Sequence, residues 1–151
     1  MDEAEVGDPR LVIDASVCLK WFLRDETLDK QAGQVLRDYI EGRLTLVAPS
    51  LLVLEFVNGL WVAARRRRIV FERVEEAVNE ILDIRFEFRD VTDLSPKIVN
   101  FCRLFGRTAY DASYLALAEH EGIQLLTGDR RLYNAVHRRL DWVVWLGSYP
   151  P

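Results

Sequence analysis

The sequence predicts an α/β domain in which a parallel sheet is covered by helices on both faces. Two observations support this class: short, apolar, β-branched segments recur along the chain, and each except the last is followed by a segment with helical periodicity. A length of 151 residues, half of them hydrophobic and 29% charged, fits one compact domain. We expect this domain over residues 11–147, after an acidic, loosely held segment of residues 1–10 and before a short tail of residues 148–151.

Five segments are expected to be strands because they are short, apolar and bounded by polar or turn residues. They are residues 11–14, 44–49, 86–91, 123–127 and 142–146. The intervening segments are expected to be helices, at residues 16–23, 28–41, 51–67, 71–84, 95–105, 110–121 and 130–138. Ser16 and Ser50 are expected N-caps, and Gly42 is expected to end the second helix.

Four acidic residues stand at the same edge of this predicted sheet. Asp14 and Asp129 follow two of the strands, and Glu55 lies in the second turn of a helix that follows a third. Asp111 begins the helix that runs back into strand 123–127, so its position is level with the far end of that strand. In open parallel sheets, ligand-binding and catalytic residues lie at the carboxyl ends of the strands, so we expect the four carboxylates to converge there.

Each acid also has a structural explanation. Asp14 and Asp129 could cap the helices that follow them, and Asp111 in a first helical turn suits the helix dipole. Glu55 is harder to explain in this way, because residues 51–64 are apolar on every side except Glu55, Asn58 and Gly59, which suggests burial all round. A buried carboxylate costs several kcal/mol unless something compensates it.

Converging carboxylates without basic partners repel one another, and a hard divalent cation relieves that repulsion. Mg²⁺ or Mn²⁺ takes oxygen ligands, and one or two such ions can activate water for attack at phosphorus. The expected activity is metal-dependent phosphodiester hydrolysis. Neither His120 nor His137 falls in these motifs, so a histidine base is not indicated, and both are expected at the surface.

Three motifs in order carry a family resemblance: "VIDASVCLKWF" with Asp14, "APSLLVLEFVNGLW" with Glu55, and "TAYDASYLALAEHEGIQLLTGDRRL" with Asp111 and Asp129. Over roughly residues 11–146 the chain resembles PIN domains, and among these the VapC-type toxin ribonucleases of type II toxin–antitoxin pairs.

The resemblance implies a three-layer α/β/α, Rossmann-like fold with a five-stranded parallel sheet. It implies a Mg²⁺- or Mn²⁺-dependent endoribonuclease that forms homodimers and is inhibited by a VapB-like antitoxin. It also suggests supporting polar roles for Ser16, Asn58 and Thr127 beside the acids. The motifs read "DAS", where many relatives have Thr and Asn after the aspartate, and "TGD" with a central glycine.

Two further groups admit two interpretations each. The run Arg65, Arg66, Arg67 and Arg68 could bind phosphate or could be a solvated helix end. The four tryptophans could stack on RNA bases, but core or dimer packing fits their apolar segments better; they are Trp21, Trp61, Trp142 and Trp145. Helix 51–64 is a plausible interface element.

Composition sets the expected compartment and excludes several classes. The formal net charge of −4 equals the charge of Asp2, Glu3, Glu5 and Asp8, so the rest of the chain is formally neutral. Two distant cysteines give no disulfide framework or zinc motif, and no segment resembles a secretion signal or a membrane span. We therefore expect a cytoplasmic protein.

Two other functional classes compete with the nuclease. A non-catalytic or weakly catalytic PIN-like module that binds RNA or protein would share the fold. A receiver-type signalling domain would need a lysine after the last strand, which "VVWLGSYP" lacks.

Overall fold

The computed structural model describes residues 9–23 and 27–150. Most of the predicted acidic N-terminal segment, residues 1–8, therefore lies outside the described residues, as does residue 151 of the predicted tail. Five parallel strands form one sheet in the order β3-β2-β1-β4-β5. The strands are β1 (Arg10–Ile13), β2 (Thr45–Pro49), β3 (Glu87–Arg89), β4 (Leu125–Thr127) and β5 (Val143–Trp145). Each overlaps its predicted segment, so the predicted five-stranded parallel sheet is confirmed.

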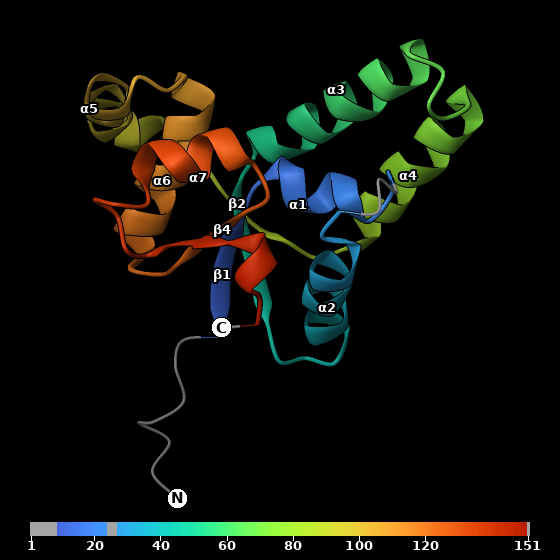
Figure 1. The fold of residues 1–151 in the computed structure, drawn as a ribbon, viewed down its shortest axis with the longest axis horizontal. Coiled ribbons are helices and arrows are strands. Elements are labelled where there is room, and N and C mark those ends of the chain that lie inside the picture. Colours follow the sequence, from blue (N-terminus) through green and yellow to red (C-terminus); the bar gives the residue numbers. More distant parts are fainter. Residues whose placement is uncertain (1–8, 24–26, 151) are drawn as a thin grey trace, which may run out of the picture.

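Helices cover both faces of the sheet. They are α1 (Ala15–Lys20), α2 (Asp29–Ile40), α3 (Leu51–Arg65), α4 (Phe71–Asp83), α5 (Ser95–Phe105), α6 (Ala109–Glu121) and α7 (Arg130–Val136), with two short 3₁₀ turns, η2 (Thr92–Leu94) and η3 (Leu146–Ser148). Figure 1 shows α1 to α4 on one side of the strands and α5 to α7 on the other. This is the predicted three-layer α/β/α arrangement. Connections between parallel strands are right-handed as a rule, so the helices that follow β1 and β2 and those that follow β3 and β4 are expected on opposite faces of this sheet.

The order of the strands reverses between β1 and β4. The chain first adds β2 and β3 on one side of β1, then crosses back and adds β4 and β5 on the other side. In register, Ile13 of β1 pairs with Leu126 of β4, and Thr127 pairs with Trp145 of β5. Asp14, which follows Ile13, therefore lies level with Thr127 at the point where open α/β sheets bind ligands.

The helix that is buried all round is α6 rather than α3. All residues of α6 from 112 to 118 are buried, whereas on α3 Leu54 is 74% exposed and Trp61 is 46% exposed. The prediction of all-round burial for helix 51–64 is therefore wrong. The physical reason is visible in Figure 1, where α3 extends beyond the sheet, so that α1 and α4 cover only part of its surface.

Capping differs in part from the prediction. Asp14, not Ser16, is the N-cap of α1, because its side chain accepts the Ser16 N–H. Ser50 makes no side-chain cap bond. Gly42 has a φ of +77°, which suits its predicted place just after α2, where a left-handed conformation ends the helix.

Gly59 sets how closely α1 and α3 pack. A Cβ atom at this position would lie 2.6 Å from Leu19 Cδ1. Only glycine lets the two helices approach so closely without displacing Leu19. Since Gly59 lies one turn after Glu55, this contact also holds the Glu55 turn of α3 beside α1.

No helix within residues 9–23 and 27–150 is long and apolar enough to cross a membrane. Cys18 is buried, Cys102 is half-buried, and both are free thiols.

Candidate active site at the carboxyl edge of the sheet

Asp14 is the central acid of this edge. It is only 6% exposed, and its carboxylate accepts hydrogen bonds from Ser16 N (3.1 Å), Ser16 Oγ and Thr127 Oγ1. Burial raises the pKa of Asp14 to about 6, although both hydroxyl bonds lower it, and repulsion from Asp129 adds to the increase. Within the described residues no Lys or Arg pairs with Asp14. The carboxylate is thus held in place without a compensating cation.

Asp129 lies next to Asp14 through a chain of hydrogen bonds. Its N–H donates to Thr127 Oγ1 (3.0 Å), the same hydroxyl that donates to Asp14. Its own Oδ1 caps α7 by accepting the N–H groups of Arg131 (2.9 Å) and Leu132 (3.3 Å). The capping explanation for this acid is therefore correct, but it occupies one carboxylate oxygen and leaves Oδ2 for another partner.

Gly128 closes this chain of contacts. Its N–H donates to Ser16 Oγ (2.8 Å), so Ser16 bridges the loops after β1 and β4. A Cβ atom at position 128 would lie 3.2 Å from Leu146 Cδ2 and 3.3 Å from Ser16 Oγ. The central glycine of "TGD" is accordingly the residue that permits the close approach.

Glu55 belongs to a second group of side chains. It is half-buried on α3 and accepts a 2.6 Å hydrogen bond from the hydroxyl of Tyr114 on α6. Burial raises the pKa of Glu55; the Tyr114 bond opposes this, and repulsion from Asp111 adds to it. Glu55 therefore lies close enough to Asp111 for the two charges to interact.

Asp111 has a basic partner, which the sequence analysis did not expect. Arg107 donates to Asp111 Oδ2 through Nη2 (2.8 Å) and Nε (3.1 Å). The expectation of carboxylates without basic partners is wrong at this position. The N-cap of α6 is Thr108, which accepts the Asp111 N–H (3.2 Å), so the carboxylate of Asp111 is free to turn toward Arg107.

The four acids thus form two pairs, Asp14 with Asp129 and Glu55 with Asp111. Tyr114 lies between them: burial raises its pKa strongly, and the charges of both Glu55 and Asp14 add to that increase. The side chains in residues 9–23 and 27–150 form no closed cluster of three or more metal-ligating groups. Convergence into one tight pocket, as the sequence suggested, is therefore not what this structure contains.

The donor set nevertheless suits a hard divalent cation. Mg²⁺ is commonly bound through one or two carboxylates while it keeps several waters, so it does not need a closed protein cage. The Asp14 carboxylate is buried, faces the like charge of Asp129 and has no cationic partner in the described part of the chain. An ion there would remove a repulsion that the protein leaves in place.

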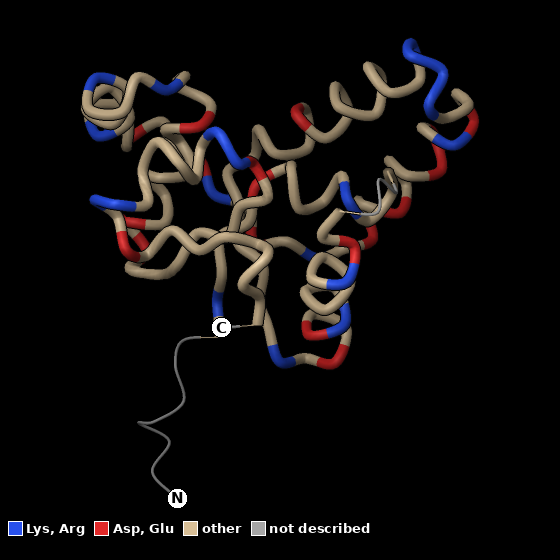
Figure 2. The backbone as a smooth tube through the Cα atoms, in the orientation of Figure 1, with Lys and Arg blue, Asp and Glu red and all other residues tan. Residues whose placement is uncertain are grey.

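The supporting residues differ in their placement. Ser16 and Thr127 both hold Asp14, whereas Asn58 is exposed and its side chain makes no hydrogen bond within the described residues. The arginine run is also exposed and lies around the turn from α3 to α4, at the far tip in Figure 2. Arg65 follows Glu55 by ten positions on α3, which is about 15 Å along the helix axis.

Sequence reasoning missed Tyr114, Arg107 and Gly128. The spacing held a signal for the first two: Tyr114 follows Asp111 by three residues, so it shares a helix face with it, and Arg107 precedes it by four. His137 was expected at the surface but is half-buried, with its ring stacked on Tyr133. His120 is exposed, as expected.

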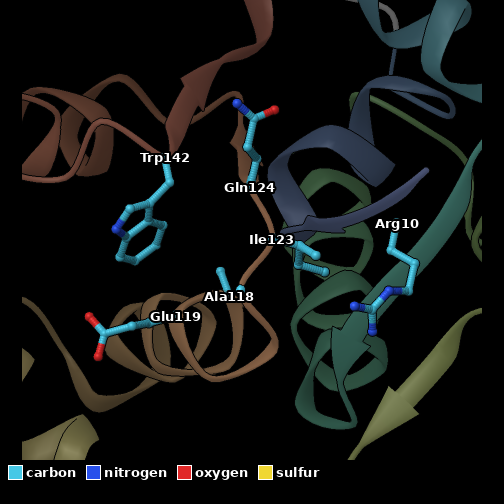
Figure 3. Close-up of a pocket in the computed structure, with 7 residues that line it drawn as sticks. Arg10, Ala118, Glu119, Ile123, Gln124 and Trp142 are labelled. Atoms are coloured by element: carbon cyan, nitrogen blue, oxygen red, sulfur yellow. The ribbon is translucent and has the colours of Figure 1, made fainter. Parts of the chain in front are cut away.

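A pocket of about 530 Å³ lies at the opposite, amino edge of the sheet. Figure 3 shows Arg10 on one side of it, Trp142 and Gln124 on another, and Glu119 of α6 below. None of the four acids lines this pocket. Its size therefore does not locate the chemistry, which depends on the carboxylates at the carboxyl edge.

Two curated relatives, both from Pyrobaculum aerophilum, are similar over most of the chain. Ribonuclease VapC3 is 33% identical over 129 residues, covering 82% of this chain and 92% of the relative. Exonuclease VapC9 is 30% identical over 106 residues, covering 68% of this chain and 76% of the relative.

Solved structures share the fold. PAE2754 from Pyrobaculum aerophilum matches with a TM-score of 0.64 and 22% identity, covering 91% of each chain. A chain of a toxin–antitoxin complex from Klebsiella pneumoniae matches with a TM-score of 0.59 and 16% identity, covering 89% of this chain and 95% of the other. The PIN domain profile matches residues 11–137, which contain all four acids. The resemblance inferred from the three motifs is thereby confirmed, and the chain belongs to the PIN domain family.

Proposed function

We propose that this protein is a Mg²⁺- or Mn²⁺-dependent ribonuclease and the toxin of a VapBC-type toxin–antitoxin pair. The observation that carries the proposal is Asp14, a buried carboxylate without a cationic partner in the described residues, held by two hydroxyls where the strand order reverses. Membership of the PIN family and similarity to a protein named Ribonuclease VapC3 support the substrate class.

The four acids and the two hydroxyl residues would have different roles in this reaction. Asp14 and Asp129 would hold the cation, and Glu55 and Asp111 would complete its surroundings or position water. When bound, a divalent ion of this kind polarises phosphoryl oxygens and makes water a better nucleophile. Ser16 and Thr127 fix the orientation of Asp14, so that its carboxylate does not turn away when substrate arrives.

Arg107 would contact the RNA backbone in the proposed reaction. Both of its contacts are to Oδ2 of Asp111, which leaves Oδ1 for another partner. A guanidinium group at this edge is also suited to bidentate contact with a phosphate. Arg107 would therefore exchange part of its contact with Asp111 for the substrate backbone.

The test is incubation of purified protein with mixed cellular RNA in Mg²⁺, in Mn²⁺ and in EDTA, followed by mapping of the cleaved ends. Cleavage that needs the metal and leaves 5′-phosphate ends supports water attack. Cleavage in EDTA with 2′,3′-cyclic phosphate ends would overturn the proposed mechanism, because that product arises from attack by the RNA's own 2′-hydroxyl.

Attack within the RNA chain is the predicted mode, and a circular RNA tests it. A circle has no ends, so only an endonuclease can open it. One similar protein carries the name Exonuclease VapC9, which makes this comparison necessary. Degradation of linear RNA with an intact circle would assign an exonuclease instead.

A weakly catalytic PIN-like module that binds RNA or protein is the second candidate. The ion pair between Arg107 and Asp111 favours it, because it lowers the negative charge available to a cation. Arg107→Gln separates the two candidates. The variant binds Mg²⁺ more tightly than the unaltered chain if the ion pair competes with the cation, and neither protein binds Mg²⁺ if the chain is a binding module without a metal site.

Partners follow from the same proposal. We infer a VapB-like antitoxin, RNA as substrate, cytoplasmic location and a homodimer formed through the exposed face of α3. On that face Leu54 is exposed and Trp61 packs edge-on against the exposed Phe71 of α4, with ring centroids 6.2 Å apart. Exposed apolar surface of this kind is typical of an interface. The four arginines after Ala64 remain a proposed phosphate-binding site at the α3 tip.

A further inference from the structure

The strongest feature that the proposed function does not use is an aromatic and basic surface on α7 and β5. It begins one residue after Asp129. Arg130 lies over the ring of Trp145 (4.0 Å from guanidinium carbon to ring centroid), Trp145 contacts Tyr133 (5.6 Å between centroids), and Tyr133 stacks on His137 (4.5 Å, with planes 10° apart). We call these four side chains the α7 stack.

Helix geometry explains why the α7 stack is continuous. Positions 130, 133 and 137 lie on one face of α7, and that face covers Trp145 of β5. Trp145 pairs in register with Thr127, whose hydroxyl holds Asp14. Neighbouring strands in a sheet are about 4.8 Å apart, so the backbone of Trp145 lies one strand away from the backbone of Thr127.

Between Asp129 and Asp141, the segment that carries α7 has basic residues and no acidic ones. Residues 130–139, "RRLYNAVHRR", contain four arginines and no carboxylate, in a chain whose formal net charge is −4. All four arginines are exposed, and Figure 2 shows basic positions at the start of α7. A run of this kind beside the acids is complementary to a polyanion that must bring one phosphate to the carboxylates.

We propose that the α7 stack and the arginines around it bind the single-stranded RNA segment that flanks the scissile phosphate. The inference rests on the proposed ribonuclease function and adds the surface that holds its substrate. Arg130 is exposed on one side and supported by Trp145 on the other, so an unpaired base can stack on the outer face of its guanidinium. The neighbouring arginines contact phosphates, and neither contact selects a particular base.

The test measures RNA binding separately from cleavage. The Asp14→Asn protein in Mg²⁺ is titrated into a short, fluorescein-labelled, single-stranded RNA pool of mixed sequence, and Kd is followed by anisotropy at several salt concentrations. On this background, Arg130→Gln with Arg131→Gln is expected to weaken binding and to reduce the salt slope of log K by about 0.7, because Arg131 makes one phosphate contact and each such contact of a single strand contributes about 0.7, whereas Arg130 stacks on a base. Trp145→Leu is expected to weaken binding about 5-fold or more.

Two matched controls separate the α7 surface from general effects. Lys30→Gln with Arg37→Gln removes the same charge from exposed positions of α2, and Trp142→Leu removes a half-buried tryptophan that leads into the same strand from its amino end. Both are expected to leave the affinity unchanged. Thermal melts by circular dichroism confirm that each variant is folded, and the exposed arginine pair provides a readout even if Trp145→Leu unfolds.

The outcomes distinguish the two proposals. Loss of affinity confined to the α7 variants supports the inference. Affinity unchanged in the arginine pair and in folded Trp145→Leu, while the unaltered chain still cleaves RNA with Mg²⁺, overturns the inference alone. No metal-dependent cleavage by the unaltered chain overturns the proposed function, and it leaves the binding comparison to decide the α7 surface independently.

Discussion

Tyr114 Oη donates a 2.6 Å hydrogen bond to Glu55 Oε1 and so joins α6 to α3 between residues that are 59 positions apart. The tyrosine is almost completely buried, and it is the only side chain that hydrogen-bonds Glu55 in the described part of the chain. The bond serves two purposes. It compensates a half-buried carboxylate, and it fixes the direction in which that carboxylate points.

We expect Tyr114→Phe to lower the free energy of unfolding by about 1–3 kcal/mol, because a half-buried carboxylate loses its donor while the ring volume is kept. Urea denaturation monitored by circular dichroism measures the change. Tyr110→Phe on the same helix is the control, since Tyr110 is 63% exposed and its hydroxyl forms no bond in the described residues. Equal midpoints for the two variants would show that the Glu55 contact contributes nothing.

Asp14→Asn is expected to abolish RNA cleavage, with a loss of about a thousandfold or more, because several kcal/mol of charge stabilisation depends on this carboxylate. The fold should be retained, since asparagine keeps the shape and removes an unpaired buried charge. Initial rates on labelled RNA and a thermal melt test both statements. Asp83→Asn, at an exposed position at the end of α4, is the control. Near-normal Mg²⁺-dependent cleavage by Asp14→Asn would remove Asp14 from the active site.

Metal binding should stabilise the unaltered protein. An ion that binds only the native state at a hundred times its Kd adds about 2.7 kcal/mol, which for a chain of this length is a rise in Tm of about 5–10 °C. Differential scanning fluorimetry in Mg²⁺, in Mn²⁺ and in EDTA measures it. The same shift is expected in Asp83→Asn and none in Asp14→Asn. A shift of equal size in both variants would mean that the ion binds elsewhere.

The exposed face of α3 gives a prediction about assembly. Leu54 is 74% exposed in the single chain, which is unusual for an aliphatic side chain on a mainly apolar helix. We expect Leu54→Glu to convert a dimer into a monomer by placing a charge in the interface. Light scattering coupled to size exclusion determines the mass. Ile40→Glu on α2, where the side chain is 70% exposed, is the control, and a mass that is the same in all three proteins would exclude this face.

Much of the fold could be predicted because local signals agree with the global arrangement. Every predicted strand and helix overlaps an observed one, and the alternation of the two fixes a parallel sheet. That topology also predicts the carboxyl edge on which the acids lie, although they form two pairs there instead of one cluster. The family resemblance added Thr127 beside the acids, and Thr127 does hydrogen-bond Asp14 although the two residues are 113 positions apart.

What could not be predicted depends on side-chain direction and on how far each helix extends beyond the sheet. Composition alone does not separate α3, which leaves Leu54 exposed, from α6, which is buried all round. Likewise, Asp111 could have capped α6, but Thr108 takes that role and Asp111 turns to Arg107. The sequence allows both arrangements, and packing decides between them.

The pH dependence of stability should be visible at a contact far from the acids, between Tyr149 and Asp38. The Tyr149 hydroxyl donates to Asp38, and Arg43 also donates to it (2.8 Å). The Tyr149 bond is the largest of the causes that lower the pKa of Asp38. A carboxylate with a lowered pKa in the folded state adds stability above its unfolded pKa, and this stability is lost as the pH falls through the folded value.

We therefore expect Tyr149→Phe to lower the free energy of unfolding by about 1 kcal/mol near neutral pH. The difference should shrink as Asp38 becomes protonated below about pH 4. Tyr39→Phe is the matched control, because the Tyr39 hydroxyl accepts the backbone N–H of Arg85 (2.8 Å), a partner that does not titrate. Its cost should be the same at every pH. Urea denaturation at a series of pH values separates the two, and a Tyr149→Phe difference that stayed constant on acidification would show that the bond does not depend on the charge of Asp38.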